Sequence, residues 1–263
     1  MRRFAGSRPD RGRRARLALS ALLLCAVAAH AATADKAPLD ILIYGASGEV
    51  GTRLLNESLR RNHRVTAVSR DVSRIVGGRR NLEVVAGNLL DDASVRELTA
   101  GRDVVLVSVR GTVGGSRDPA DTVHLLGIRQ VVEALRAAGN TRTRVLIVGG
   151  AGSLEVRPGV TYAESIPRIF YWFVPGELKR EIAGHRMALA FLASVDDVHW
   201  TYVSPPKRFK PGRRTGRYRL GGTELPVDRD GRSHISMEDF AVAMLDLAEA
   251  GGHRHSHLSV VAD

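Results

Sequence analysis

A glycine-rich turn early in the chain is the feature that most constrains its fold. Residues 45–51 read Gly-Ala-Ser-Gly-Glu-Val-Gly. The apolar run at 39–44 predicts a buried strand before this turn, and residues 52–61 predict a helix after it. A strand, a turn with this glycine spacing and a helix form the first unit of folds that bind a diphosphate group. The first glycine permits the tight turn, the second lets the diphosphate approach the backbone, and the third lets helix and strand pack closely.

A diphosphate at this turn would lie at the helix N-terminus, where unpaired N–H groups and the helix dipole favour an anion. The residues expected to contact it are Gly45, Ser47, Gly48, Glu49, Val50 and Gly51. An ordinary glycine-rich turn is the alternative interpretation, and the pattern of the downstream chain disfavours it.

Strands and helices alternate over the rest of the chain. Apolar runs predict strands at 64–69, 82–86, 103–108, 144–149 and 198–203, and helical spacing predicts helices at 92–100, 121–138 and 176–193. Near-continuous apolar strands separated by helices indicate a parallel sheet that is covered on both faces. We therefore predict one α/β domain with a doubly wound parallel sheet over residues 39–263.

The C-terminal part of the chain has a different pattern. Residues 216–227 suggest a small hairpin, and residues 258–261 suggest an edge strand. Ser236 is expected to cap a helix that runs to Ala250. We expect these elements to form a small substrate subregion of the same domain.

Ligands of doubly wound folds bind at the carboxyl ends of the strands, so the residues there are candidates for contact. Arg70 follows the second strand directly, with Arg74 nearby. An acid at this place would accept the ribose 2′-hydroxyl of NAD, whereas an arginine pairs with the 2′-phosphate of NADP. Arg70 therefore favours NADP(H), while Asp71 beside it leaves NAD(H) open. A solvated surface arginine is the alternative interpretation.

The remaining strand ends carry small polar residues. Asn88 is expected near the adenine, and Ser108 and Ser153 are expected to line the nicotinamide pocket. Gly149 and Gly150 suggest backbone that lies close to a ligand. A plain strand-to-loop turn is the alternative for each of these segments.

Several motifs together make the chain resemble the atypical short-chain dehydrogenases. They are the glycine turn, the arginine after the second strand, and the segments 148–154, 200–206, 211–219 and 235–241. The chain is most similar to NAD(P)H-binding proteins of the NADH-flavin-reductase-like and NmrA-like type, akin to the biliverdin/flavin reductases, over residues 39–263. The resemblance implies a Rossmann-type fold and NAD(P)H-dependent hydride transfer to a small planar acceptor such as a flavin or quinone.

One family motif is missing. Standard short-chain dehydrogenases use Tyr-x-x-x-Lys, but Tyr162 is followed four residues on by Ile166, and Tyr171 by Pro175. The resemblance instead implies that His185 lines the active site, where its imidazole suits a proton donor near neutral pH. A half-buried structural histidine is the alternative. A non-catalytic NADP(H)-binding redox sensor is the second hypothesis for the whole domain.

Residues 169–175 concentrate four aromatic side chains in a chain that has few. They could form a lid that stacks on a planar ring, or a membrane or partner contact. The simplest interpretation, which we favour at this point, is a loop packed on its own core.

Two further clusters carry weaker signals. Six basic residues lie close together in the sequence: Arg208, Lys210, Arg213, Arg214, Arg217 and Arg219. They could attract an anionic substrate, although a solvated basic face is the simpler interpretation. His253, His255 and His257 alternate without a carboxylate at useful spacing, so we expect no metal site.

The N-terminus resembles an export signal. Residues 1–34 hold seven arginines and one aspartate, so they carry +6 of the net charge of +11, ahead of a short apolar run at 17–29. Arg13-Arg14 hints at twin-arginine export, which would place the mature protein in the periplasm. A mis-assigned start codon, and hence a cytoplasmic protein, is the alternative. We expect no stable membrane span and no nucleic-acid partner, because the remaining charge of +5 is modest and no binding motif accompanies it.

Overall fold

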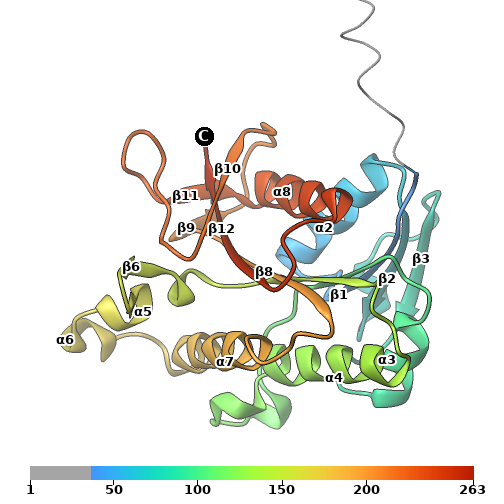
Figure 1. Ribbon diagram of the computed structural model, residues 1–263, viewed down its shortest axis with the longest axis horizontal. Helices are drawn as coiled ribbons and strands as arrows, with labels where there is room; N and C mark the ends of the chain where they lie inside the picture. Colours follow the sequence, from blue (N-terminus) through green and yellow to red (C-terminus); the bar gives the residue numbers. More distant parts are fainter. Residues whose placement is uncertain (1–36) are drawn as a thin grey trace, which may run out of the picture. The chain divides into compact units, whose positions relative to one another are not determined.

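An eight-stranded sheet forms the centre of the computed structural model, which describes residues 37–263 (Figure 1). Its strand order is β10–β12–β8–β5–β4–β1–β2–β3. The strands are β1 (Asp40–Tyr44), β2 (Arg64–Ser69), β3 (Leu82–Ala86), β4 (Val104–Val107), β5 (Arg144–Val148), β8 (His199–Ser204), β10 (Tyr218–Gly221) and β12 (Ser256–Ala262). All neighbours pair in parallel except β10, which runs antiparallel to β12. The doubly wound α/β fold expected from the sequence is confirmed.

Helices cover both faces of this sheet (Figure 1). Helices α2 (Glu49–Arg60) and α8 (Met237–Ala250) lie on one face, and α3 (Asp92–Thr99), α4 (Val123–Ala137) and α7 (Gly176–Leu192) lie on the other. Strand β1 shows how two cores arise from one apolar run. Ile41 and Ile43 pack into the core beneath α2 and α8, whereas Leu42 and Tyr44 pack into the other core. Because successive side chains of a strand point to opposite faces, a strand buried on both sides has to be apolar throughout.

The strand order reverses at β1, which pairs with β2 on one side and with β4 on the other. The connections that leave the carboxyl ends of β1 and β4 therefore diverge to opposite faces of the sheet. Such a switch point opens a crevice at the sheet edge, and this is where doubly wound proteins bind ligands.

Local capping explains where two predicted helices begin. Asp91 accepts hydrogen bonds from the Ala93 and Ser94 N–H groups at the start of α3. Ser236 accepts from the Asp239 N–H group at the start of α8, as predicted. Helix α2 begins three residues earlier than expected, because Gly48 takes the extended N-cap conformation and the rest of the glycine motif forms its first turn. The helix N-terminus thus lies inside the motif.

Two expectations for the C-terminal part are wrong. Residues 216–227 do not form a hairpin, since β10 pairs with β12 instead of with a strand that follows it. The predicted edge strand is the longer β12, which lies inside the sheet between β8 and β10. The sequence pattern indicated both strands but did not indicate which strands they pair with.

Short elements complete the described chain. The strands are β6 (Glu155–Arg157), β7 (Val160–Thr161), β9 (Arg208–Lys210) and β11 (His234–Ser236). The helices are α5 (Tyr162–Ser165) and α6 (Arg168–Tyr171), with single 3-10 turns at Val72–Arg74, Val113–Gly115, Pro119–Asp121 and Ala151–Ser153.

Residues Pro38–Asp263 form one compact unit. Among residues 37–263, no helix has the length and apolar character needed to cross a bilayer. The predicted export signal at 1–34 lies outside the described residues.

Candidate active site

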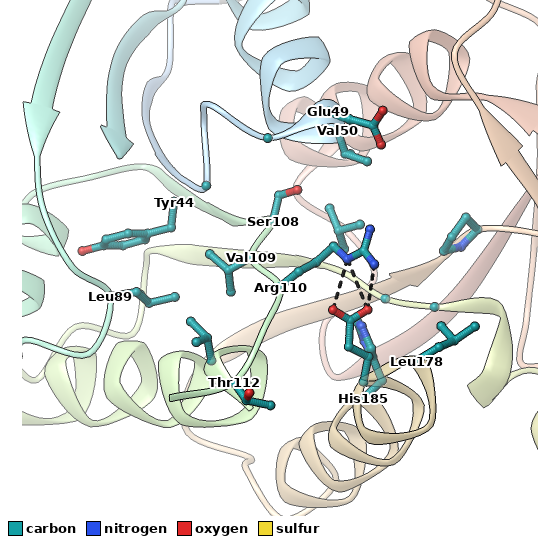
Figure 2. A pocket seen from close by; sticks show the side chains of 18 of the residues that line it. Tyr44, Glu49, Val50, Leu89, Ser108, Val109, Arg110, Thr112, Leu178 and His185 are labelled. Carbon is teal, nitrogen blue, oxygen red and sulfur yellow. Dashed lines mark hydrogen bonds and ion pairs between the residues drawn. The ribbon is translucent and has the colours of Figure 1, made fainter. Parts of the chain in front are cut away.

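A cleft of about 960 Å³ opens at the carboxyl ends of the central strands. The connections that follow β1, β2, β3, β4 and β5 line it, together with helix α7. Figure 2 shows part of this cleft, with Glu49 and Val50 of α2 on one side and Leu178 and His185 of α7 on the other. The crevice expected at the switch point is therefore present, and it is large enough for a ligand bigger than most small molecules.

The glycine turn forms one end of the cleft, and the effect of adding a side chain differs among its three glycines. Gly45 has a φ of +80°, and a Cβ there would collide with the Ser108 carbonyl oxygen. A Cβ on Gly51 would collide with the Gly45 carbonyl oxygen, so the helix packs directly on the turn. Gly48 differs, because its φ is an ordinary −78° and a Cβ would meet only the Gly45 oxygen at 3.2 Å. The space that a Gly48 side chain would fill belongs to the cleft.

The first turn of α2 has no side-chain cap, since Gly48 has none to offer. The N–H groups of Glu49, Val50 and Gly51 have no partner within the helix at this end. Thr52 Oγ1 donates to the Gly48 carbonyl at 2.8 Å and so stabilises the first turn of the helix. A twelve-residue helix thus presents an open, electropositive N-terminus to the cleft.

Two arginines stand beside this end of the cleft. Arg70 lines it and makes no hydrogen bond or ion pair within residues 37–263. Arg74 also lines it, and its guanidinium donates to the Ser47 carbonyl at 3.4 Å. The Asp71 carboxylate caps the next turn by accepting from the Ser73 N–H at 3.1 Å and the Ser73 hydroxyl at 2.6 Å. Arg70 is therefore free for a ligand, Arg74 makes one long contact with the turn, and the Asp71 carboxylate is engaged by Ser73.

The other strand-end residues line the cleft, with one exception. Asn88, Ser108, Gly149 and Gly150 all line the cleft. The Asn88 side-chain oxygen accepts from the Leu90 N–H at 3.1 Å, which leaves its amide nitrogen for other partners. A side chain on Gly149 would collide with the Tyr202 ring, so packing inside the protein demands this glycine.

Ser153 is the exception. Its side chain is buried, donates to the Gly150 carbonyl at 2.9 Å and meets the Ser204 hydroxyl at 3.1 Å. It is absent from the cleft wall. The expectation that its hydroxyl lines the nicotinamide pocket is corrected, because the turn at Ala151–Ser153 directs this side chain inward, beneath Gly150.

His185, which is half-buried in the cleft wall, belongs to a cluster with the buried rings of His124 and Tyr202 that the sequence did not indicate. Its Nδ1 atom lies 2.7 Å from the Tyr202 hydroxyl, and His124 Nε2 approaches the same hydroxyl at 3.2 Å. The His124 and His185 rings are 3.9 Å apart between centroids. Burial raises the pKa of Tyr202, so its hydroxyl keeps its single proton. It can therefore donate to one imidazole and accept from the other, which fixes the orientation of both rings.

Burial also sets the charge of this cluster. It lowers the pKa of His185 to about 4, an effect that Glu181 opposes and Arg110 reinforces. Burial, followed by the neighbouring His185, holds the pKa of His124 well below its usual value. Both imidazoles are then neutral at pH 7. A neutral His185 would offer a hydrogen bond to a ligand, and its part in proton transfer stays a prediction.

An ion pair crosses the cleft beside His185. Arg110 follows β4 and Glu181 lies on α7, and their side chains are joined by contacts of 3.0, 3.2 and 3.3 Å (dashed lines from Arg110 in Figure 2). Glu181 is nearly buried, so the hydrogen bonds from Arg110 compensate its charge. The pair links α7, which carries His185, to the strand end that carries Ser108.

The expectation that the aromatic segment packs on the core is wrong. Ile169, Phe170, Trp172 and Phe173 are between 64% and 82% exposed. Val174, which follows them, lines the cleft instead. The segment therefore borders the cleft and directs its largest side chains outward.

Some members of the basic segment and of the histidine run have structural partners. Arg214 forms a paired contact of 2.8 Å with Glu57, and Arg219 lies 3.5 Å from Asp263. His255 Nε2 donates to the Val198 carbonyl at 2.9 Å, and His257 Nε2 lies 2.9 Å from the Ser204 hydroxyl. No cluster of metal-ligating side chains occurs within the described part of the chain.

Comparison with known proteins identifies relatives of this architecture. A match to the NAD(P)H-binding protein family covers residues 45–250. A proposed epimerase from Bacteroides thetaiotaomicron is 33% identical in sequence, and its structure superposes with a TM-score of 0.74 over 86% of this chain and 97% of that one.

Two further solved structures are similar. A proposed exported protein from Burkholderia pseudomallei is 35% identical, with a TM-score of 0.69 over 85% of this chain and 99% of that one. A proposed NADH-flavin reductase from Streptococcus pneumoniae is 25% identical, with a TM-score of 0.70 over 86% of this chain and 100% of that one.

Proposed function

This chain belongs to the NAD(P)H-binding family, and we propose that it is an oxidoreductase that uses NADP(H) to reduce a small planar acceptor of the flavin or quinone type. One observation carries the proposal. A single cleft joins an open helix N-terminus and two arginines at one end to an apolar wall with a neutral histidine at the other.

The dinucleotide would lie along the first end. The space beside Gly48 and the N–H groups of the first turn of α2 fit a diphosphate. Arg70 and Arg74 would bind the 2′-phosphate of NADP(H), and the engagement of Asp71 with Ser73 argues against an acid that accepts the ribose of NAD(H). Asn88 and Ser108 would contact the adenine and nicotinamide ends, respectively.

The acceptor would lie against α7. Leu178, Ile182, Pro206 and Phe209 line this part of the cleft, and apolar walls of this kind suit a flat ring system. His185 stands in the same wall, held by Tyr202, and would hold a carbonyl or ring nitrogen of the acceptor through a hydrogen bond. The bound dinucleotide would supply the hydride. The absence of Tyr-x-x-x-Lys agrees with hydride transfer between stacked rings, because this reaction requires little proton transfer by the protein.

The test is NADPH oxidation with a panel of flavins and quinones, run beside a direct measurement of NADPH binding. We expect micromolar binding and turnover with at least one acceptor. Tight binding without turnover on any acceptor would favour the second candidate, a non-catalytic NADP(H) sensor. Absence of binding would contradict both.

We also propose that the protein is exported, with residues 1–34 as the signal. The sequence pattern of that segment and the similarity to a protein described as exported support this. Because twin-arginine export moves folded proteins, the coenzyme could travel within the domain. The mass of the protein isolated from whole cells tests the idea, and a chain that still starts at Met1 would contradict cleavage.

A further inference from the structure

The segment Ile169–Phe173, which we call the aromatic tip, exposes four large apolar side chains within five residues. Ile169 is 70% exposed, Phe170 64%, Trp172 82% and Phe173 77%. Figure 1 shows α6, which begins this segment, at the outer end of the molecule beyond α5 and α7. Apolar side chains gathered in this way at a projecting point are typical of a contact surface and not of a solvated loop.

Basic residues flank the aromatic tip in the sequence. Residues 168–180 hold three cations, Arg168, Lys179 and Arg180, and one acid, Glu177. The Arg168 side chain makes no hydrogen bond or ion pair within residues 37–263. Lys179 lies 4.9 Å above the Tyr171 ring and donates to the Trp172 carbonyl at 3.4 Å, which keeps its charge beside the tip.

We propose that the aromatic tip docks the protein on the surface of a bilayer that contains anionic phospholipid. Its apolar side chains would enter the boundary between headgroups and acyl chains, where tryptophan is favoured. Arg168, Lys179 and Arg180 would meet the lipid phosphates, so the charges of the two surfaces are complementary.

The structure argues against two other occupants. A second copy bound through the same patch would place the two sets of cations against one another, because a two-fold interface pairs each patch with itself. A lid would direct its large side chains toward the cleft, but none of the four lines it. Ile166, Val174 and Leu178 already cover that side.

Docking at this place has a consequence for the acceptor, and this step rests on the proposed function. Since Val174 and Leu178 line the cleft directly beside the tip, the cleft would open next to the bilayer. An acceptor dissolved in lipid, such as a long-chain quinone, would then reach the apolar wall without crossing water.

Trp172 provides the measurement. The chain has two tryptophans, and Trp200 is 4% exposed with its indole N–H bound to the Val195 carbonyl, so a change in emission on vesicle addition reports Trp172. We would titrate residues 37–263 with vesicles of phosphatidylcholine alone and of phosphatidylcholine with phosphatidylglycerol. The variants are F170S/F173S and, as a matched control, V76S, which replaces a 79% exposed apolar side chain elsewhere.

The expected result is a blue shift and vesicle co-sedimentation with phosphatidylglycerol, retained by V76S. F170S/F173S should bind at least roughly 10-fold more weakly, because each phenylalanine that leaves water contributes about that factor. No shift, or equal binding to phosphatidylcholine alone, would overturn the proposal. So would a dimer that F170S/F173S dissociates, or a shift caused by NADPH and acceptor without vesicles. Vesicle binding needs no turnover, so vesicle binding without NADPH oxidation would contradict only the proposed function.

Discussion

At the scale of single residues, the contacts within the protein decide which side chains at the proposed nucleotide end of the cleft are available to a ligand. Arg70 has no partner within the described residues, whereas the Asp71 carboxylate is occupied by Ser73. Hydrogen bonding to the Ser73 hydroxyl and N–H holds the pKa of Asp71 below its usual value, so the carboxylate stays ionised and capped. The sequence identified Arg70 and left the role of its neighbour open. The free Arg70 and the engaged Asp71 support the proposed preference for NADP(H).

Replacing Arg70 with alanine should therefore weaken NADPH binding and leave NADH binding almost unchanged. Loss of a charged hydrogen bond to phosphate corresponds to roughly 10- to 100-fold in affinity. Calorimetric titration of both coenzymes measures the ratio. Arg80→Ala is the matched control, since Arg80 is exposed and does not line the cleft. An unchanged NADPH/NADH ratio in Arg70→Ala would contradict the assignment.

Tyr202 illustrates a residue that no local pattern could reveal. It stands in an apolar strand, and its hydroxyl meets His124, which lies 78 positions away in sequence. The two contacts of this hydroxyl exist only after β8, α4 and α7 have packed together. Gly45, Gly48 and Arg70 could be identified from the sequence as cleft residues, because their positions depend only on the strand end on which they lie.

Replacing Tyr202 with phenylalanine should lower turnover with a quinone acceptor while the KM for NADPH stays the same. The change leaves two buried imidazoles unpaired and frees the His185 ring, at a cost of about 1–3 kcal/mol in unfolding free energy. Tyr218→Phe is the control, because it also removes a hydroxyl contact, to Asp246 at 2.5 Å, and neither residue of that pair lines the cleft. Equal turnover in both variants would show that Tyr202 has no positioning role.

At the scale of elements, local pattern determined the strands near the site and failed further along the chain. Strands β2 and β3 have the predicted bounds, because the turns on both sides of a short apolar run fix where the strand begins and ends. Strand β12 was misplaced as an edge strand, since its neighbours β8 and β10 are separated from it by long stretches of chain. Helix α2 and the glycine turn form one unit, in which Gly51 lets the helix rest on the turn.

Replacing Gly51 with alanine should disrupt that unit. The added Cβ would collide with backbone at Gly45, which cannot move as a flexible side chain would. We expect a loss of roughly 1–3 kcal/mol or more in unfolding free energy, as for other overpacked sites. Urea unfolding followed by circular dichroism measures it. A variant as stable as the parent would show that α2 can shift away from the turn.

At the scale of the whole molecule, buried histidines link stability to pH. Burial lowers the pKa of both His185 and His257 to about 4, from a usual value of 6.5. The unfolded chain therefore binds these protons first, so stability is complete above about pH 6.5 and is lost as pH falls toward 4.

Unfolding free energy should accordingly fall between pH 7 and pH 4.5, by up to roughly 3 kcal/mol for each of the two histidines. Urea unfolding at a series of pH values tests this. The double variant His185→Gln/His257→Gln should show a flatter dependence. A parent protein with constant stability over this range would contradict the burial of neutral rings.

The central claim is that a diphosphate lies against the glycine turn, and Gly48 tests it most directly. Gly48 has ordinary backbone angles, lines the cleft and, unlike Gly51, would bring a Cβ no closer to the protein than 3.2 Å, at the Gly45 carbonyl oxygen. The measurement is the Kd of NADPH for the parent and for Gly48→Val, with circular dichroism and the unfolding midpoint recorded for both. The account predicts a folded variant that has lost NADPH binding. A folded Gly48→Val that binds NADPH as tightly as the parent would contradict it.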